Sequence, residues 1–506
     1  MAAAVVGIEA IPVTVEVDVS SGLPCVTMVG LPDATVRESR DRVRAAIRNS
    51  GFPFPDGRVT VSLAPADVRK VGAAFDLPIA LGVLAAGGYL PHRAPASYPI
   101  VGGLSLDGSV PAMRGLLPIA AAARRATPQA LMCPTANLAE AGIITGLDVF
   151  AVPSLIDAAR VLCDPRARPS ATKEAGSPVP APRPAEDLAD VQGQLAGRRA
   201  LEIAAAGAHH LLFNGPPGAG KTMLARRLPG LLPCLDFDEA LTVTTIHSVA
   251  GLVAPGQGLV TSRPFRAPHH TCSYVSLVGG GSVPRPGELS LAHHGILFLD
   301  ELPEFGRHVL ETLRQPLEEG VVRIARAAGS VTLPADVMLV GAMNPCPCGH
   351  AGSAVARCRC TPGAAERYRE RLSGPLRDRF DLHVELPAVP WQDLRRPGAG
   401  ERSAAVAARV AAARARQVTR QGRPNGRLAA QTVRAVCQTG DARAEAVLER
   451  GVTRLGLSAR AVTRVLRVAR TIADLAAASG IDASHVAEAL QFRAHEGRPG
   501  AEHVGR

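Results

Sequence analysis

Residues 211–228 read "LLFNGPPGAGKTMLARRL", the most informative segment of the chain. Apolar residues 211–213 predict a buried strand, and a glycine-rich loop then leads into a helix. The loop matches the pattern G-x-x-x-x-G-K-[ST] in the strand–loop–helix context that this pattern requires. We therefore expect ATP phosphates to bind the backbone N–H groups of the loop at the helix N-terminus. The expected ATP-binding residues are Gly215, Pro216, Pro217, Gly218, Ala219, Gly220, Lys221 and Thr222.

Composition supports a special role for the lysine of this loop. Lysine occurs only at Lys70, Lys173 and Lys221, although Lys and Arg together number 56. Arginine therefore supplies nearly all of the positive charge, and lysine persists where a compact ammonium is useful. Lys221 is expected to reach the β and γ phosphates, and the Thr222 hydroxyl is expected to bind Mg²⁺.

A second motif, "GILFLDELPEF", starts at residue 295. Its apolar residues predict a buried strand that ends at Asp300 and Glu301. After a phosphate-binding loop, Asp300 is expected to bind Mg²⁺ and Glu301 to act as general base toward water. The alternative is a pair of helix-capping acids without a catalytic role.

Three further residues extend the expected site. The next apolar strand ends at Asn344, which can orient the attacking water or simply form a turn before a proline. Arg379, in "RLSGPLRDRFDLHVEL", can project into the nucleotide of a neighbouring copy. Arg460 begins a long helix that can fold onto the γ-phosphate. The alternative for both arginines is an ordinary surface position in an arginine-rich chain.

The chain of 506 residues is too long for a single core. Residues 1–163 alternate strand-like and helical segments and predict an α/β domain. Residues 164–187 are rich in Pro and Ala and predict a linker. Residues 188–389 predict the nucleotide-binding α/β core, which carries a Cys-rich insertion at 346–360. Residues 390–498 predict a helical lid, because apolar residues recur there at helical spacing.

In this order, the motifs resemble an AAA+ ATPase. The stretches "FRAPHHTCSYVSLVGGGSVPRPGELSLAHH" and "NPCPCG" resemble its magnesium-chelatase-like branch. Together with "GLPDATVRESRDRVRAAIRNSGFPFPDGRVTVSLAP" near the N-terminus, nearly the whole chain is similar to the YifB/ComM family. The resemblance implies an ATP- and Mg²⁺-dependent hexameric ring that acts on DNA as a helicase or branch-migration factor in recombination or transformation, alongside recombination proteins.

The N-terminal domain resembles the proteolytic domain of Lon, with a fold like domain 2 of ribosomal protein S5. Lon-type proteolysis needs a serine and a lysine. The matched positions carry Ala74 and Leu117, which can supply neither nucleophile nor base. We therefore expect a non-peptidase domain that scaffolds the ring or its partners.

Four cysteines, Cys346, Cys348, Cys358 and Cys360, form two C-x-C pairs. Four thiolates can hold a structural Zn²⁺, although C-x-C is tighter than the usual spacing and His350 can replace one sulfur. Reduced thiols without metal and a redox pair remain alternatives. The insertion lies between Asn344 and Arg379, so we expect a rigid, metal-stabilised strut between these two residues.

The net charge of +11 and the resemblance favour a DNA partner. Aromatic residues make up only 3% of the chain, so backbone contact by arginine is favoured over base stacking. Two insertions are candidates for DNA contact, and the second, "VVRIARAAGSVTLP" from residue 321, is expected to form a hairpin. Solvated surface arginines are the alternative for both. The candidate residues are Arg263, Arg266, Arg285, Arg323 and Arg326.

Two classes of function remain open at this point. The first is a DNA-translocating or unwinding ATPase motor that works as a homo-oligomer. The second is a chelatase-like or regulatory ATPase that remodels a protein partner without binding DNA. We expect a cytoplasmic protein without membrane contact, because no apolar run reaches the length of a membrane span and the N-terminus does not resemble a signal peptide.

Overall fold

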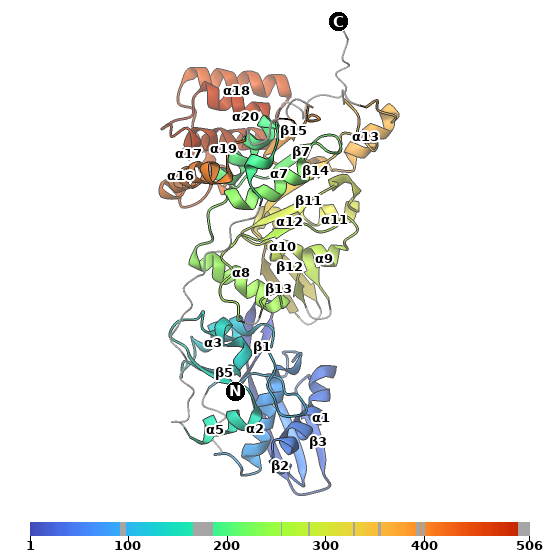
Figure 1. Cartoon of the computed structure of the whole chain (residues 1–506), viewed down its shortest axis with the longest axis vertical. Coiled ribbons are helices and arrows are strands. Elements are labelled where there is room, and N and C mark those ends of the chain that lie inside the picture. The colour runs from blue at the N-terminus through green and yellow to red at the C-terminus, as the bar shows by residue number, and fades with distance from the viewer. Residues whose placement is uncertain are drawn as a thin grey trace.

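The computed structural model describes most of the chain. The described residues are 1–91, 98–164, 186–254, 256–281, 284–326, 329–352, 356–390, 395 and 400–493. Most of the predicted linker, at 165–185, lies outside them, as do the last thirteen positions, 494–506. Figure 1 shows an elongated arrangement, with the N-terminal unit at one end, the phosphate-loop unit in the middle and the C-terminal helices at the other end.

The N-terminal unit is built on a four-stranded sheet with strand order β1-β2-β4-β3. The strands are β1 (Ala2–Val6), β2 (Glu9–Ser20), β3 (Cys25–Val29) and β4 (Arg58–Ala64). All neighbours are antiparallel except β3 and β4. Helices α1 (Ala34–Asn49) and α2 (Asp76–Ala86) pack together, and α2 also contacts β2. Beyond them lie α3 (Leu116–Ala123), α5 (Leu155–Cys163) and the parallel pair β5 (Ala130–Pro134) and β6 (Asp148–Val152).

The middle unit contains a five-stranded parallel sheet with strand order β15-β7-β14-β11-β8. The strands are β7 (Leu211–Asn214), β8 (Phe265–Arg266), β11 (Ile296–Leu299), β14 (Met338–Met343) and β15 (Leu382–Glu385). Every residue of β11 and β14 is buried, as expected for parallel strands covered on both faces. The α/β class predicted from the alternation of strands and helices is confirmed, and the structure shows that this sheet is parallel.

Helices and two hairpins surround this sheet. The principal helices are α6 (Leu195–Gly207), α7 (Lys221–Arg227), α8 (Phe237–Ala250), α9 (Tyr274–Val278), α10 (Glu288–Leu291), α11 (Arg307–Glu311), α12 (Arg314–Glu319), α13 (Pro362–Glu370) and α14 (Gly374–Arg377). The hairpins pair β9 (Gly279–Gly280) with β10 (Arg285–Pro286) and β12 (Val321–Arg326) with β13 (Gly329–Pro334). The second hairpin was predicted from the sequence.

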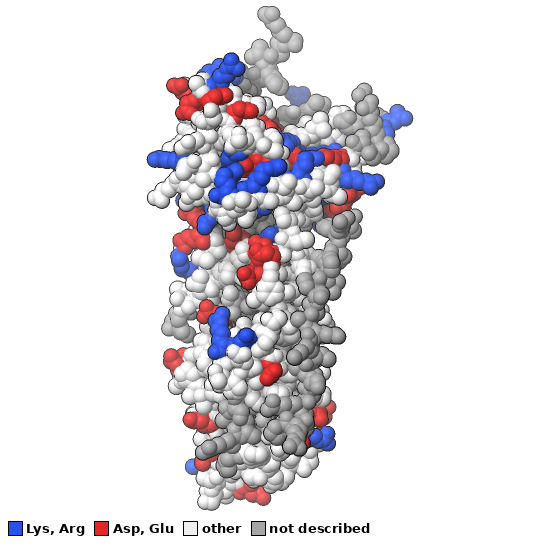
Figure 2. Space-filling model, turned by 90° about the vertical axis from the view of Figure 1, so that its left-hand side faces the viewer, with Lys and Arg blue, Asp and Glu red and all other residues white. Residues whose placement is uncertain are grey.

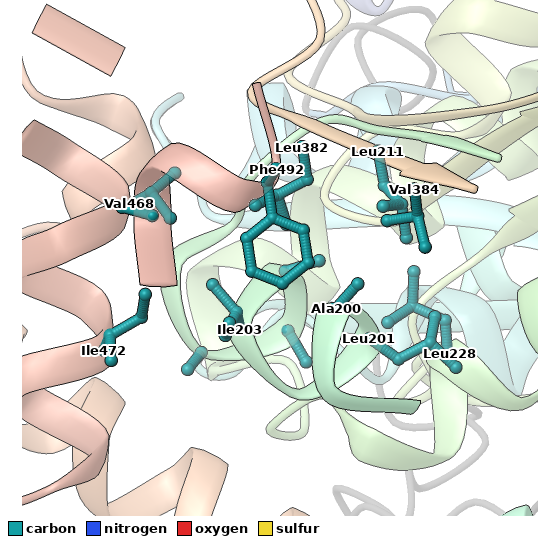
Figure 3. Close-up of a cluster of buried hydrophobic side chains, with 14 of the residues drawn as sticks. Ala200, Leu201, Ile203, Leu211, Leu228, Leu382, Val384, Val468, Ile472 and Phe492 are labelled. Carbon is teal, nitrogen blue, oxygen red and sulfur yellow. The ribbon is translucent and has the colours of Figure 1, made fainter. Parts of the chain in front are cut away.

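The C-terminal unit is wholly helical among its described residues, as predicted. It consists of α16 (Ser403–Gln421), α17 (Ala430–Val436), α18 (Ala442–Leu455), α19 (Ala459–Leu475) and α20 (Ala483–Gln491). Its apolar core is continuous with that of the sheet. Figure 3 shows Phe492 between Leu382 of β15 and Ile203 of α6, with Val468 and Ile472 of α19 beside them. Because one core serves both parts, movement of these helices must disturb packing around the sheet.

The N-terminal unit meets the middle unit through α3 and α8. The Gly115 N–H, at the start of α3, donates to the Ser248 carbonyl of α8 at 3.1 Å. The Ser248 hydroxyl also hydrogen-bonds the carboxylate of Glu140, which is buried in the N-terminal unit. A second contact joins the turn after β1 to β13, where Gly7 lies against Val331. The two units are therefore in direct contact at these two places.

A buried ionic network holds the C-terminal helices together. Asp474, which is 1% exposed, accepts hydrogen bonds from Arg420 at 2.8 and 2.9 Å and from Arg470 at 2.9 Å. The Asn425 side chain donates to the same carboxylate at 2.8 Å. A buried carboxylate with so many donors is costly to remove, because its partners would be left as unpaired buried cations.

We predict that Asp474→Ala lowers the free energy of unfolding by about 3–5 kcal/mol, because Arg470 would be buried without its partner. Urea denaturation followed by circular dichroism measures this loss. The matched control is Asp41→Ala, which removes the exposed ion pair with Arg40 and should change stability by less than about 0.5 kcal/mol. Equal effects of the two substitutions would contradict the assigned role of the network.

Candidate functional site

The phosphate loop follows β7, which lies between β15 and β14 in the parallel sheet, and ends where α7 begins with Lys221. Gly218 and Gly220 have φ angles of +78° and +85°, which residues with a Cβ rarely adopt. These two glycines let the chain turn tightly before the helix, so that backbone N–H groups at its start face one small region. Such a helix N-terminus favours anions.

Lys221 connects this loop to the neighbouring strand. Its ammonium donates hydrogen bonds to the Gly215 carbonyl at 2.6 Å, the Pro216 carbonyl at 3.0 Å and the Asn344 side-chain oxygen at 2.9 Å. Burial lowers the pKa of Lys221, and the nearby carboxylates of Asp300 and Glu301 oppose this shift. Asn344 follows β14, which pairs directly with β7, so adjacent strand ends bring the two side chains together.

The two acidic residues lie at the end of the next strand, β11. The Thr222 hydroxyl donates to the Asp300 carboxylate at 2.6 Å, which joins two oxygen ligands of the kind that Mg²⁺ prefers. Glu301 is 54% exposed and has a φ of +51°, an uncommon conformation for a residue with a side chain. Strained backbone of this kind clusters at functional sites. The donors and acceptors present therefore fit an Mg²⁺–nucleoside triphosphate.

The two predicted arginines lie elsewhere, on one cavity of about 430 Å³. Arg379 and Arg460 line it together with Arg427, Arg464 and Arg467, and no residue of the phosphate loop is among its lining residues. Sequence reasoning expected Arg460 to fold onto the γ-phosphate. In the structure Arg460 lines the same cavity as Arg379, and Arg464, on the same helix α19, donates to the Arg379 carbonyl at 2.7 Å.

This arginine cavity has incompletely satisfied donors. Arg379 pairs with Glu318, but its Nε atom is buried without a hydrogen-bond partner in the described part of the chain. The same holds for Nε of Arg467, whose pKa is lowered by burial. Arg464 is engaged by Asp381 at 3.1 Å. Several guanidinium groups surround this cavity, and the nearby carboxylates do not pair with all of their N–H donors. An anion bound in the cavity would therefore be favoured.

The four cysteines of the insertion converge, and all ten cysteines of the chain are free thiols. Sulfur–sulfur distances are 3.4 Å for Cys346–Cys348, 3.7 Å for Cys346–Cys358 and 3.6 Å for Cys348–Cys358. A zinc tetrahedron with bonds of about 2.3 Å has edges of about 3.8 Å, so the spacing fits Zn²⁺ and is too long for a disulfide. All four sulfur atoms lie within 4.8 Å of one another, without His350 in the group.

The sulfur cluster packs against the phosphate loop. Gly349, in the turn between the cysteines, lies so close to Pro217 that an added Cβ would be 2.5 Å from the Pro217 Cδ atom. The backbone amides of Arg359 and His350 lower the pKa of Cys348 to about 5, which favours the thiolate. The insertion between Asn344 and Arg379 therefore also contacts the phosphate loop, which the sequence did not indicate.

The arginines predicted to contact DNA divide into two groups. Arg263 donates to the Pro233 carbonyl at 2.6 Å and pairs with Glu239 at 2.8 Å. Arg266 forms a two-pronged ion pair with Glu288 at 2.6 and 2.8 Å. These internal contacts disfavour DNA binding by either side chain, because they would have to be broken.

The remaining three candidates lie on the hairpins. Arg285 of β10 is exposed, and Arg323 of β12 is 59% exposed and paired with Glu319. Arg326 ends β12, and its side chain lies outside the described residues. Figure 2 shows one face of the molecule, on which Lys and Arg gather toward the end formed by the C-terminal helices. The other half of this face carries scattered charges of both signs.

Sequence reasoning missed two side chains near the site. Gln194 is buried and donates to the carbonyls of Ala219 at 3.0 Å and Pro387 at 2.7 Å, which links the phosphate loop to the chain after β15. It lines a cavity of about 420 Å³ beside α6. His270 lies 3.2 Å from the Glu301 carboxylate, measured from Nδ1 to Oε2. The sequence gives no sign of this contact, because the two residues are far apart in the chain.

Comparison with known proteins identifies the family. Residues 187–394 match the family model "Magnesium chelatase, subunit ChlI", residues 15–137 match "Subunit ChlI of Mg-chelatase", and residues 400–493 match "Magnesium chelatase, subunit ChlI C-terminal". The protein YifB of Salmonella typhimurium is 45% identical over 494 residues, which cover 97% of this chain and 96% of that protein. The chain belongs to the YifB/ComM family of magnesium-chelatase-like proteins.

Two other relatives carry functional names. The competence protein ComM of Haemophilus influenzae is 44% identical over 492 residues, 96% of each chain. The Holliday junction branch migration complex subunit RuvB of Mycobacterium avium is 25% identical over 289 residues, 54% of this chain and 64% of that protein. Membership of the YifB/ComM family makes this an AAA+-type ATPase, with ATP and Mg²⁺ as the implied ligands. Among the described residues, no helix is both long and apolar enough to cross a membrane.

We predict that the protein binds about one zinc ion per chain, and that Cys348→Ser abolishes this binding. ATPase activity should fall with it, because the cluster supports the phosphate loop through Gly349 and Pro217. Zinc content by atomic absorption and hydrolysis rate are measured on the same sample. Cys25→Ser, at an exposed position of the N-terminal unit outside the cluster, is the control and should leave both unchanged. Zinc loss without loss of activity would refute the support role.

Proposed function

We propose that this protein is an ATP-hydrolysing motor that assembles as a ring, with six copies as the expected number, and acts on DNA. The observation that carries the proposal is the meeting of three strand ends: Lys221 contacts Asn344, and Thr222 contacts Asp300. These are the side chains that bind phosphate, bind Mg²⁺ and orient water in enzymes that cleave nucleoside triphosphates.

Each residue has a defined role in the proposed reaction. Lys221 binds the β and γ phosphates, while Thr222 and Asp300 hold Mg²⁺, whose charge stabilises the phosphates when it is bound. Asn344 positions the attacking water, and Glu301 accepts its proton. As the water oxygen bonds to the γ-phosphorus, the bond from this phosphorus to the bridging oxygen breaks. ADP and inorganic phosphate are released.

The second cavity beside the loop is suited to the nucleoside. Gln194 and the segment around it line this cavity, and Gln194 is bonded to the loop residue Ala219. We propose that the base and ribose occupy this cavity while the phosphates lie in the loop. The ligand would then contact both the start of α6 and the chain that leads into the C-terminal helices.

The arginine cavity supports a ring of copies. Arg379 and Arg460 line it together, separately from the phosphate loop. In the proposed ring, both side chains face the γ-phosphate held by the next copy and neutralise charge in the transition state. Each active site is then made of two copies, so that a monomer hydrolyses ATP poorly.

We predict that Arg379→Ala and Arg460→Ala each lower the hydrolysis rate by roughly 10³-fold, the usual contribution of an arginine supplied by a partner. Mixing either variant with Lys221→Ala should restore part of the activity, because some interfaces would combine an intact loop with intact arginines. A phosphate-release assay measures the recovery. Arg443→Ala, exposed on α18, is the control and should retain full activity. No recovery in any mixture would contradict the shared site.

DNA is the proposed substrate for three reasons. One relative is named a competence protein and another a branch migration subunit. The net charge of the chain is +11. Arg285 and Arg323 are exposed on the two hairpins of the middle unit, where they can contact phosphates. On the basis of these names, we propose a helicase or branch-migration activity in recombination or transformation. Recombination proteins are the proposed partners.

We predict that single-stranded or forked DNA stimulates ATP hydrolysis, and that the stimulation declines as salt rises, because arginine–phosphate contacts release counterions. The rate is measured with and without each DNA across a salt series, with Lys221→Ala as the inactive control. Hydrolysis that depends on Lys221 but ignores every DNA would overturn the DNA proposal. It would favour the alternative, an ATPase that remodels a protein partner.

For the N-terminal unit we propose a Lon-like fold without peptidase activity. Ala74, at the position matched to the Lon serine, lies in a short 3₁₀ helix. Leu117, at the position matched to the Lon lysine, is a fully buried residue of α3. The unit instead offers surfaces for scaffolding. The four-cysteine cluster suits a structural zinc ion and a reducing compartment, so we propose a cytoplasmic location.

A further inference from the structure

The segment that carries Arg379 is held from outside by the C-terminal helices. The guanidinium of Arg464, on α19, donates a hydrogen bond to the Arg379 carbonyl at 2.7 Å. The guanidinium of Arg493, two residues after α20, donates to the next carbonyl, that of Phe380, at 2.6 Å. The side chain of Arg464 is 12% exposed and Arg493 is 1% exposed, so water competes little for either contact. Two arginines of the C-terminal unit therefore hold two consecutive carbonyls, the first of which belongs to Arg379.

A buried carboxylate fixes Arg464 in this position. Asp381 is 3% exposed, and one of its oxygens accepts a hydrogen bond from Arg464 at 3.1 Å. The other oxygen accepts from the His210 backbone N–H at 3.1 Å and lies 3.3 Å from Nδ1 of His209. These two histidines lie between α6 and β7, next to the parallel sheet. Arg464 is thus anchored to the sheet while it holds the Arg379 carbonyl.

These contacts bear on the reach of Arg379, which lies in a short connection between α14 and β15. The N–H of Arg379 donates to the Leu376 carbonyl at 2.9 Å, at the preceding helix. The described hydrogen bonds to its own carbonyl and to the next one come from Arg464 and Arg493. A displacement of about 1 Å in a catalytic group can lower a rate by roughly 10²-fold. Loss of either donor is therefore expected to misplace the Arg379 guanidinium.

Helix α19 serves both arginines that are proposed to act on the next copy. Arg460 and Arg464 are four residues apart on this helix, so their side chains lie on one face, and both line the arginine cavity. A shift of α19 moves Arg460 directly and moves the Arg379 backbone through Arg464. The two arginines are therefore positioned together by one helix.

We propose that Arg464 and Arg493 are positioning residues, which hold the backbone of Arg379 so that its guanidinium meets the nucleotide of the next copy. The C-terminal helices of one copy then set the hydrolysis rate in the neighbouring active site. This inference rests on the proposed shared site, and it adds the contacts by which the helices of one copy act on the nucleotide of another.

A direct contact between Arg464 and the bound phosphate is the competing role, because Arg464 also lines the cavity. The two roles differ when Arg379 is absent. A positioning residue acts through Arg379 and has no effect without it, whereas a phosphate ligand contributes on its own. A double variant therefore separates them.

The test compares hydrolysis by Arg464→Met, Arg379→Ala and the double variant in a phosphate-release assay at saturating ATP. We expect Arg464→Met to lower the rate roughly 10- to 100-fold. The double variant should be no slower than Arg379→Ala alone. Arg464→Lys, which retains a charged donor, should recover part of the rate. The affinity for a fluorescent ATP analogue should stay the same, because the phosphate loop of each copy is unchanged.

Mixing supplies a readout that a purely structural role would not change. Lys221→Ala copies keep both contacts to the Arg379 segment, so mixing them with Arg464→Met copies should restore part of the activity. Arg416→Met is the matched control. Arg416 also donates to a backbone carbonyl inside the C-terminal unit, that of Asp474 at 2.9 Å, and its loss should leave the rate unchanged.

Arg493→Met is the second variant, since it leaves the pair of Arg464 with Asp381 intact. It should lower the rate in the same way and also have no effect in the Arg379→Ala background. Thermal melting establishes which variants are folded, and Arg493→Met decides the question if Arg464→Met is unfolded.

The outcomes separate this proposal from the shared site. If Arg379→Ala keeps the wild-type rate, the shared site is refuted and positioning of Arg379 with it. If Arg379→Ala is slow but folded Arg464→Met and Arg493→Met hydrolyse at the wild-type rate, positioning alone is refuted. A double variant slower than Arg379→Ala, or no recovery on mixing with Lys221→Ala, also overturns positioning.

Discussion

The hydrogen bond from the Lys221 ammonium to the Asn344 side chain is the contact on which the rest of the site depends. It exists because β7 and β14 are paired, parallel and buried, so that both strands end at one edge of the sheet. The Thr222–Asp300 bond extends the same edge to β11. Rigid strands hold these groups at fixed distances, which catalysis by positioning and electrostatics requires.

Positive charge gathers at two separate places in the molecule. One lysine lies at the phosphate loop, whereas several arginines line a separate cavity. The compact ammonium of a lysine can contact phosphates that are enclosed by the loop. Planar guanidinium groups are suited to bind the phosphate of a ligand held by another molecule. Nε atoms of Arg379 and Arg467 are buried without hydrogen bonds among the described residues, which is unfavourable in the isolated chain. An incoming phosphate would relieve this cost.

Three structural supports surround the loop. The turn that carries the four cysteines contacts Pro217 through Gly349, Gln194 joins Ala219 to the chain after β15, and the apolar core runs without a break into the C-terminal helices. Each support connects the loop to a different part of the chain. In the proposed reaction, conversion of ATP to ADP at the loop could therefore shift the insertion, the start of α6 and the C-terminal helices through these packed contacts.

The amino-acid sequence by itself determined the phosphate loop, the acidic strand end at Asp300 and Glu301, the α/β class and the thiol cluster, because each depends on residues close together in the chain. Only the tertiary structure decided which distant side chains meet. The order β14-β11-β8 placed His270 on Glu301, and the packing of α19 brought Arg460 to the same cavity as Arg379. Ion pairs engaged Arg263 and Arg266, which looked free in the sequence. A local motif fixes the backbone turn and the reactive side chains of one short segment. Strand order and helix packing bring together residues that are far apart in the chain, so no short sequence pattern indicates these contacts.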